Sequence, residues 1–429
     1  MAGLVVMKFF AAAVGLAVAI ALVRSLTTKA RTIGNFSVDV ARSILRVLVP
    51  IAVPVAILLV GLGTVQNLHG YRAATTLEGA TQLLPGGPVA TQVVMKPLGT
   101  NGGGFYNANS AHPFDNPKVV TILVQIFLCL VIPLALPFMF GALVKNRRQG
   151  RTLLVVMAVL WIIPLGFGMI AEGCGNTALP ASVNQSIGAG QSGGMEGMDV
   201  RFGAGGSALL ALLSMGTTKG ISSSGVDSYA LTGQAGAFVP ILLGEVSSGG
   251  VGNGLVGMLL YVLFSTFIGG LMVGRTPIYL GRRLGLTGMK LVMIATLAIP
   301  IAELGVVAIS TLVAGGTMSR AGAHGLTENV YAAGPATNAN GSATGGLTVT
   351  SSWWLISLGV AMMIGRFLVI IPILALAGSL GRQPFLATTE ASLDTTGRTF
   401  TRLLLFTVVV VGLTYLPTIV LTVVHAALG

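Results

Sequence analysis

The sequence predicts an all-α polytopic membrane protein, with about eight transmembrane helices and three re-entrant pore loops arranged in helix–pore–helix pseudo-repeats. Only 8% of its 429 residues are charged, against about 25% in an ordinary soluble chain. Apolar residues make up 53%, and the mean hydropathy is +0.88. A soluble surface needs more charge than this, whereas lipid accepts apolar side chains.

Eight apolar segments are long enough to cross a bilayer, which takes about 20 residues. Several contain prolines such as Pro133 and Pro300, which a bundle tolerates because neighbouring groups re-satisfy the freed backbone. The first has one early cation, Lys8, but no small-residue cleavage site, so we interpret it as a retained helix and not a signal peptide. The segments are roughly 4–25, 44–65, 118–140, 152–171, 252–274, 289–313, 352–378 and 402–427.

The Lys and Arg residues predict the orientation. Every second connection between the segments is basic, and such connections face the cytoplasm. The other connections, 66–117, 172–251 and 314–351, are long, glycine-rich and poor in cations, so we expect them on the opposite side, together with both termini. The net charge of +12 therefore reflects membrane topology, and no nucleic-acid partner is expected. The basic connections contain Lys29, Arg31 and Arg42; Lys145, Arg147, Arg148 and Arg151; Arg275, Arg282, Arg283 and Lys290; and Arg382, Arg398 and Arg402.

Each of the three long connections contains an apolar stretch too short to span the membrane, followed by a polar glycine cluster. The clusters centre on Gly102, Gly220 and Gly341, which are 118 and 121 residues apart. A regular period of this kind indicates internal duplication. All three clusters combine glycine with hydroxyl or amide side chains and contain no acid.

This composition suits a potassium site. The ion exchanges its hydration shell for backbone carbonyl oxygens, and aiming successive carbonyls at one axis requires φ/ψ values that glycine adopts freely. The alternative interpretation is that the glycines only allow close helix packing or flexible outer loops. The regular spacing favours the pore.

No motif for ATP hydrolysis is present. The run 102–104 is not followed by Gly-Lys-Ser/Thr, and no Asp-Lys-Thr-Gly occurs in the chain. We expect no catalytic residue and no ATP site on this chain, so a partner must supply the energy. The two cysteines, Cys129 and Cys174, define neither a disulfide framework nor a metal site.

The first glycine loop and its flank, residues 99–117, read GTNGGGFYNANSAHPFDNP. This run resembles the KdpA family, the potassium-binding subunits of Kdp potassium-transporting P-type ATPases, within the superfamily of K+ transporters. The resemblance covers essentially the whole chain. It extends through further runs at 196–203, 244–246, 249–254, 274–277, 340–342 and 365–367.

The family has ten spanning helices and four pseudo-repeats of helix, pore loop and helix. The resemblance implies that K+ is bound by this chain in the cell inner (plasma) membrane and passed to a separate ATPase subunit, KdpB, in a complex with KdpC and a KdpF-like peptide. Membrane lipids are its other partners. By position, the implied filter residues are Thr100, Asn101, Gly102, Gly103, Thr218, Gly220, Asn340, Gly341 and Ser342.

The chain departs from the family pattern at its start, because Met1 follows the place of the first pore loop. We therefore expect two helices and one quarter of the filter to be missing, as in a fragment or a degenerate paralogue. The expected division is 1–65, a helix after the missing loop plus the outer helix of repeat two; 66–140, pore loop two and its inner helix; 141–280, repeat three; 281–380, repeat four; and 381–429, the C-terminal helix.

Three ionisable residues are expected to gate or modulate the ion path. Lys219 stands where the family has a small residue. Its side chain either faces the ion, which weakens binding, or points away from it or snorkels to the aqueous face. Glu245 lies in a glycine-interrupted stretch that suits a broken helix beside a cavity. Arg366 lies mid-span behind the filter, where charge is a functional candidate, and Glu303 is a possible partner for it.

Two other functions remain open. A secondary cation transporter usually has inverted repeats and midplane charges, whereas these repeats are parallel and midplane charge is sparse. A truncated membrane scaffold that no longer conducts is suggested by the missing loop and by Lys219.

Overall fold

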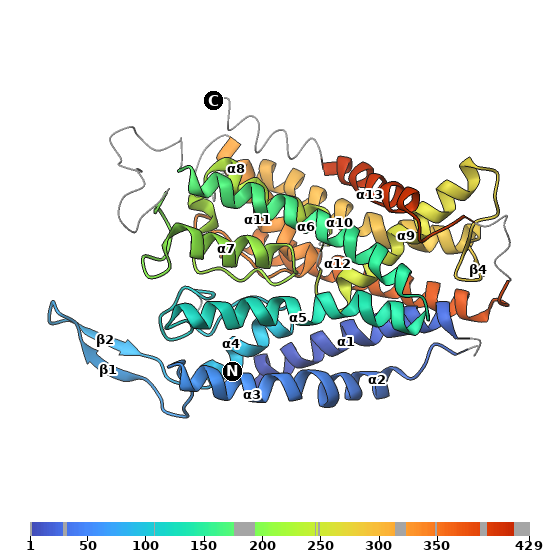
Figure 1. The fold of residues 1–429 in the computed structure, drawn as a ribbon. Coiled ribbons are helices and arrows are strands. Elements are labelled where there is room, and N and C mark those ends of the chain that lie inside the picture. Colours follow the sequence, from blue (N-terminus) through green and yellow to red (C-terminus); the bar gives the residue numbers. More distant parts are fainter. Residues whose placement is uncertain are drawn as a thin grey trace.

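The computed structural model describes residues 2–28, 32–106, 108–175, 194–244, 246–247, 249–313, 323–347, 350–386 and 393–415. It is a bundle of helices with two small hairpins (Figure 1). The helices are α1 (Ala2–Thr27), α2 (Phe36–Ser43), α3 (Val49–Gly61), α4 (Val89–Leu98), α5 (Val119–Leu143), α6 (Arg147–Gly173), α7 (Gly203–Met215), α8 (Leu231–Leu242), α9 (Asn253–Met272), α10 (Leu286–Val313), α11 (Ala323–Asn338), α12 (Ser352–Arg382) and α13 (Arg398–Gly412). The strands are β1 (Arg72–Thr75), β2 (Thr81–Leu84), β3 (Ile278–Tyr279) and β4 (Arg282–Arg283).

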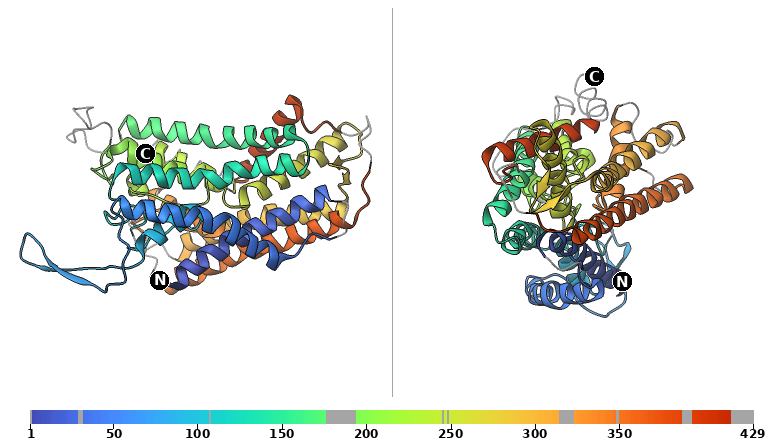
Figure 2. Two further views of the ribbon diagram at one scale, coloured as in Figure 1. Left: turned by 60° about the horizontal axis from the view of Figure 1, so that its bottom comes forward. Right: turned by 90° about the vertical axis from the view of Figure 1, so that its right-hand side faces the viewer.

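The predicted fold class is confirmed, because eight helices in the described part of the chain are long and apolar enough to span a membrane. The last is described only as far as Tyr415, so the rest of the predicted segment 402–427 lies outside the described residues. The most buried of the eight is α9, which contacts α1, α5, α10 and α13. Figure 2 shows it among these helices when the bundle is viewed end-on.

The second span begins at Phe36, eight residues before its predicted start. The Asn35 side chain caps this helix by accepting a hydrogen bond from the Val38 amide at 3.2 Å. In the first turn, Asp39 pairs with Arg24 of α1, with 2.9 Å between Nη2 and Oδ1. A π-helical turn (Ile44–Leu48) then joins α2 to α3 just before Pro50, which has no N–H for a regular helical bond. Because the first turns of this helix contain polar residues, a prediction based on hydropathy places its start too late.

Three short helices do not span the bundle. These are α4, α7 and α11, each followed by one of the glycine clusters, as expected for re-entrant segments. The sequence analysis did not predict the antiparallel hairpin of β1 and β2, which lies between α3 and α4 and projects from one end of the bundle (Figure 1).

Three of the four basic connections meet at one buried side chain, Arg282, which is 1% exposed. Its Nε donates to the Ser25 carbonyl oxygen at 3.0 Å and its Nη2 to that of Thr28 at 2.8 Å. Its Nη1 donates to the carbonyl oxygen of Gln383, beyond the end of α12. Arg282 therefore ties together the connections that follow α1, α9 and α12.

The remaining basic connection joins the same group. Gln149, at the start of α6, donates to the Thr395 hydroxyl at 2.5 Å and accepts from the Tyr279 hydroxyl at 3.2 Å. All four basic connections thus lie at one end of the bundle, as the alternation of charge predicts, and the hairpin of β1 and β2 lies at the other (Figure 1). That the basic end faces the cytoplasm remains a prediction.

Replacing Arg282 with methionine is expected to lower the free energy of unfolding by roughly 3 kcal/mol or more, because three carbonyls lose their donor in a buried site. Thermal unfolding in detergent measures this. The control is Arg283→Met, which removes the same charge from the exposed neighbour. Equal losses in the two variants would contradict the bridging role of Arg282.

Candidate functional site

The three re-entrant helices end in the same backbone turn. In each, the amide of the residue before the central glycine donates to the carbonyl five residues earlier: Asn101 to Lys96 at 3.2 Å, Lys219 to Ser214 at 3.3 Å, and Asn340 to Pro335 at 2.9 Å. This six-to-one bond is the mark of a Schellman cap, which requires a left-handed residue just before the donor. The three loops are therefore structural equivalents, as their spacing predicts.

In each loop two left-handed residues flank one ordinary residue, and in the first loop a third, Gly103 with φ of 67°, follows directly. The first of each pair is Thr100, Thr218 or Ala339, with φ values of 55°, 59° and 57°. These are unusual for residues with a β-carbon, which adopt this region at a cost of about 1–2 kcal/mol. The second is the central glycine, with φ of 57° at Gly102, 53° at Gly220 and 83° at Gly341. Such alternation turns successive peptide dipoles toward one side of the chain.

The central glycines bring the loops into contact with one another. A β-carbon on Gly102 would lie 2.5 Å from the carbonyl oxygen of Lys219 and 2.8 Å from that of Asn340. A β-carbon on Gly341 would lie 2.7 Å from the Asn101 carbonyl oxygen, and one on Gly220 would overlap Asn340 and the Ser342 amide. Carbonyls from all three loops therefore gather around the glycines, and no larger residue fits there.

Side chains also link the loops. The Asn109 side-chain nitrogen Nδ2 donates to the Gly220 carbonyl oxygen. The Asn340 Nδ2 donates to the Met215 carbonyl oxygen at 3.3 Å. A main-chain bond adds a further link, in which the Ser110 backbone amide donates to the Ser222 carbonyl oxygen at 2.8 Å. In the second loop Thr218 is 1% exposed, and its hydroxyl has no hydrogen-bond partner among the described residues. A buried oxygen without a donor is suited to a cation.

Lys219 does not reach the aqueous face, so that part of the prediction is wrong. The side chain is fully buried at 0% exposure, and its Nζ donates to the Thr217 carbonyl oxygen at 2.9 Å. The loop folds the side chain back onto its own backbone, because a buried ammonium requires acceptors. The backbone of Lys219 makes the same six-to-one hydrogen bond that Asn101 and Asn340 make in the other two loops.

A second ammonium, which the sequence analysis missed, lies at the first loop. Lys8 on α1 is 6% exposed. Its Nζ donates to the Gly102 carbonyl oxygen at 3.3 Å and to Gln92 Oε1 at 2.8 Å. The Lys8 backbone carbonyl oxygen in turn accepts a hydrogen bond from the Asn101 side-chain nitrogen Nδ2 at 3.3 Å. The available signal was a charge inside an apolar span, which marks a functional candidate.

A third lysine, Lys96, is fully buried in α4 and was also missed. Its Nζ donates to the Asn109 carbonyl oxygen at 2.9 Å and lies 3.6 Å from Asp115 Oδ2. Burial raises the pKa of the Asp115 carboxyl, and the Lys96 ammonium opposes that shift; burial lowers the pKa of Lys96 itself. This pair holds the chain after the first loop against its re-entrant helix.

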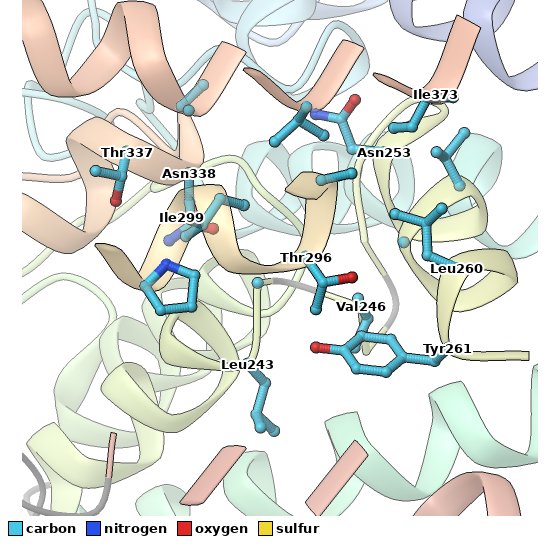
Figure 3. Close-up of a pocket in the computed structure, with 18 of the residues that line it drawn as sticks. Leu243, Val246, Asn253, Leu260, Tyr261, Thr296, Ile299, Thr337, Asn338 and Ile373 are labelled. Atoms are coloured by element: carbon cyan, nitrogen blue, oxygen red, sulfur yellow. The ribbon is translucent and has the colours of Figure 1, made fainter. Parts of the chain in front are cut away.

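A cavity of about 110 Å³ lies inside the bundle, next to the loop that follows α11. Thr337 and Asn338, from the end of α11, line it together with Asn253 and Tyr261 of α9 (Figure 3). Arg366 of α12 also lines this cavity. The structure therefore brings Arg366 close to the start of one candidate filter loop.

Two further expectations concern acids. Glu245 lies outside the described residues, although its neighbours Gly244 and Val246 line the cavity. Among the described residues, Arg366 and Glu303 form no ion pair. Glu303 instead accepts a hydrogen bond from the Thr337 hydroxyl at 3.5 Å.

Comparison with known proteins identifies the family. Residues 1–428 match the family model KdpA, described as potassium-transporting ATPase A subunit. The chain is 48% identical over 427 residues to the "Potassium-transporting ATPase potassium-binding subunit" of Mycobacterium tuberculosis (strain ATCC 25618 / H37Rv), covering 98% of this chain and 75% of the relative. The protein of the same name from Clavibacter michiganensis subsp. michiganensis is 44% identical over 430 residues, covering 98% and 76%. With its three equivalent glycine loops and its eight candidate spanning helices, this chain belongs to the KdpA family.

Proposed function

We propose that this chain is the potassium-binding and translocating subunit of an ATP-driven potassium uptake complex in the cell inner (plasma) membrane. The observation that supports this most strongly is the shared turn of the three loops, which gathers backbone carbonyls around Gly102, Gly220 and Gly341. Carbonyl rings of this type replace the hydration shell of K+. The filter comprises the nine implied residues in 100–103, 218–220 and 340–342.

The re-entrant helices support cation binding for a second reason. All three end at the filter, so their C-terminal ends face it. The partial negative charge of a helix lies at that end and favours a nearby cation. The Thr218 hydroxyl adds a buried oxygen. The site thus attracts a monovalent cation through dipoles.

Beyond the filter, the proposed path enters the cavity lined by Thr337, Asn338 and Arg366. There the Arg366 guanidinium modulates ion passage by repulsion. Glu245, whose chain neighbours Gly244 and Val246 line this cavity, is proposed to help gate it. From this cavity K+ passes to a separate ATPase subunit, KdpB, with KdpC and a KdpF-like peptide completing the complex. ATP is hydrolysed on the partner, because this chain has no recognisable phosphorylation motif.

The proposal is tested by thermal unfolding of the purified chain in detergent with rising K+, and with Na+ as the matched control. A ligand that binds only the folded state adds RT ln(1 + [L]/Kd), about 2.7 kcal/mol at a hundred times Kd. We expect K+ to raise the unfolding temperature and Na+ to leave it unchanged. Equal behaviour in both ions would overturn the proposal and favour the scaffold.

A further inference from the structure

The ammonium of Lys8 donates a hydrogen bond to a carbonyl oxygen of the proposed filter. Its Nζ donates to the Gly102 carbonyl oxygen at 3.3 Å, and Gln92 of α4, itself 2% exposed, accepts from it at 2.8 Å. Among the described residues, no carboxylate oxygen lies within 4.0 Å of this Nζ. The charge of Lys8 is therefore met by neutral oxygens, one of which belongs to the filter.

We infer that the Lys8 ammonium competes with K+ for the Gly102 carbonyl and so sets the potassium affinity of the filter. An ammonium group has the same charge as K+ and nearly the same size, and both require several oxygen acceptors. Lys8 holds two such oxygens from a fixed position on α1. This inference rests on the proposed function, because it concerns the same filter.

The position of the charge determines the direction of the effect. A K+ ion bound to the Gly102 carbonyl would lie close to the Lys8 Nζ, and both cations would share one acceptor. At about 5 Å and an effective dielectric constant near 20, two unit charges repel strongly enough to raise Kd by roughly a hundredfold. Asp115 acts on Lys8 electrostatically, but the buried Lys96, 3.6 Å from Asp115, adds a second positive charge that opposes it.

A purely structural Lys8 would act in the opposite direction. If its hydrogen bonds only held the first loop in place, removing them would loosen Gly102 and weaken potassium binding. Competition instead predicts tighter binding when the charge is removed. The sign of the change in Kd separates the two roles.

The test measures the Kd for K+ by titration calorimetry on the detergent-purified full chain and on its variants. Lys8→Met removes the charge while keeping a long apolar side chain, and Lys8→Gln provides a second neutral variant if the first folds poorly. The matched control is Lys290→Met, which removes one charge from an exposed position on α10. Lower Kd values, by roughly a hundredfold, are expected for both Lys8 variants and not for the control.

The outcomes separate this inference from the proposed function. Potassium binding by the unaltered chain that tightens in both Lys8 variants, and not in the control, supports both. An unchanged or weaker Kd in both Lys8 variants, with the unaltered chain still binding K+, overturns competition and leaves the proposed function intact. No binding by the unaltered chain or by any variant overturns the proposed function, and the inference with it.

Discussion

Replacing Gly220 with alanine is expected to abolish the potassium-dependent rise in unfolding temperature. A β-carbon at this position would overlap Asn340 and the Ser342 amide of the neighbouring loop, closer than the 3.0 Å that real contacts keep. The loops would have to separate, and the carbonyls would no longer converge. A loss of about 2.7 kcal/mol in the free energy of potassium binding raises the Kd for K+ about a hundredfold. Titration of the variant with K+, followed by thermal unfolding, measures the effect.

The control for Gly220→Ala is Gly274→Ala. Gly274 has φ of 67°, so alanine there carries the same left-handed cost of about 1–2 kcal/mol, but no atom lies within 4 Å of its β-carbon position. This control should therefore lose some stability and still respond to K+. If Gly220→Ala also retained the full potassium response, close contact between the loops would not be needed for binding.

The sequence could predict features that depend on local composition. Long apolar segments define the eight spans because a bilayer requires about 20 such residues. Glycine clusters at regular spacing located the three loops, since left-handed backbone favours glycine. The left-handed Thr100, Thr218 and Ala339 were not predictable in this way. Their conformation comes from the cap at the end of each re-entrant helix and not from their own preference.

Contacts between distant residues were beyond a single sequence. Lys8 and Gly102 are 94 residues apart, yet the ammonium of one bonds to the carbonyl of the other. One alternative for Lys219 was that its side chain reaches the aqueous face, because lysine prefers water. The surrounding loops instead bury it, and the Thr217 carbonyl provides an acceptor. Only the packed arrangement of the helices determines which lysine reaches which acceptor.

The second large effect is expected for Gly365→Ala in α12. Gly365 lies directly against the end of α11, where a β-carbon would overlap the Thr337 carbonyl oxygen and lie 2.8 Å from its carbon. Thr337 is rigid, because its hydroxyl bonds to the Ala333 carbonyl at 3.0 Å and to the Gly334 carbonyl at 2.9 Å. Overpacking at such a contact costs about 1–3 kcal/mol. The shift also displaces Asn340 and raises the Kd for K+ by about tenfold for each 1.4 kcal/mol lost.

Gly359→Ala, six residues earlier in the same helix, separates this contact from helix propensity. No atom lies within 4 Å of its β-carbon position, so alanine should leave stability unchanged or raise it by up to about 1 kcal/mol. The two variants are therefore expected to move the unfolding temperature in opposite directions, and only Gly365→Ala should weaken the response to K+. If the unfolding temperature changed in the same direction in both variants, α12 would have shifted to make room for a β-carbon at Gly365. The position of the third filter loop would then not depend on the close approach of α11 and α12.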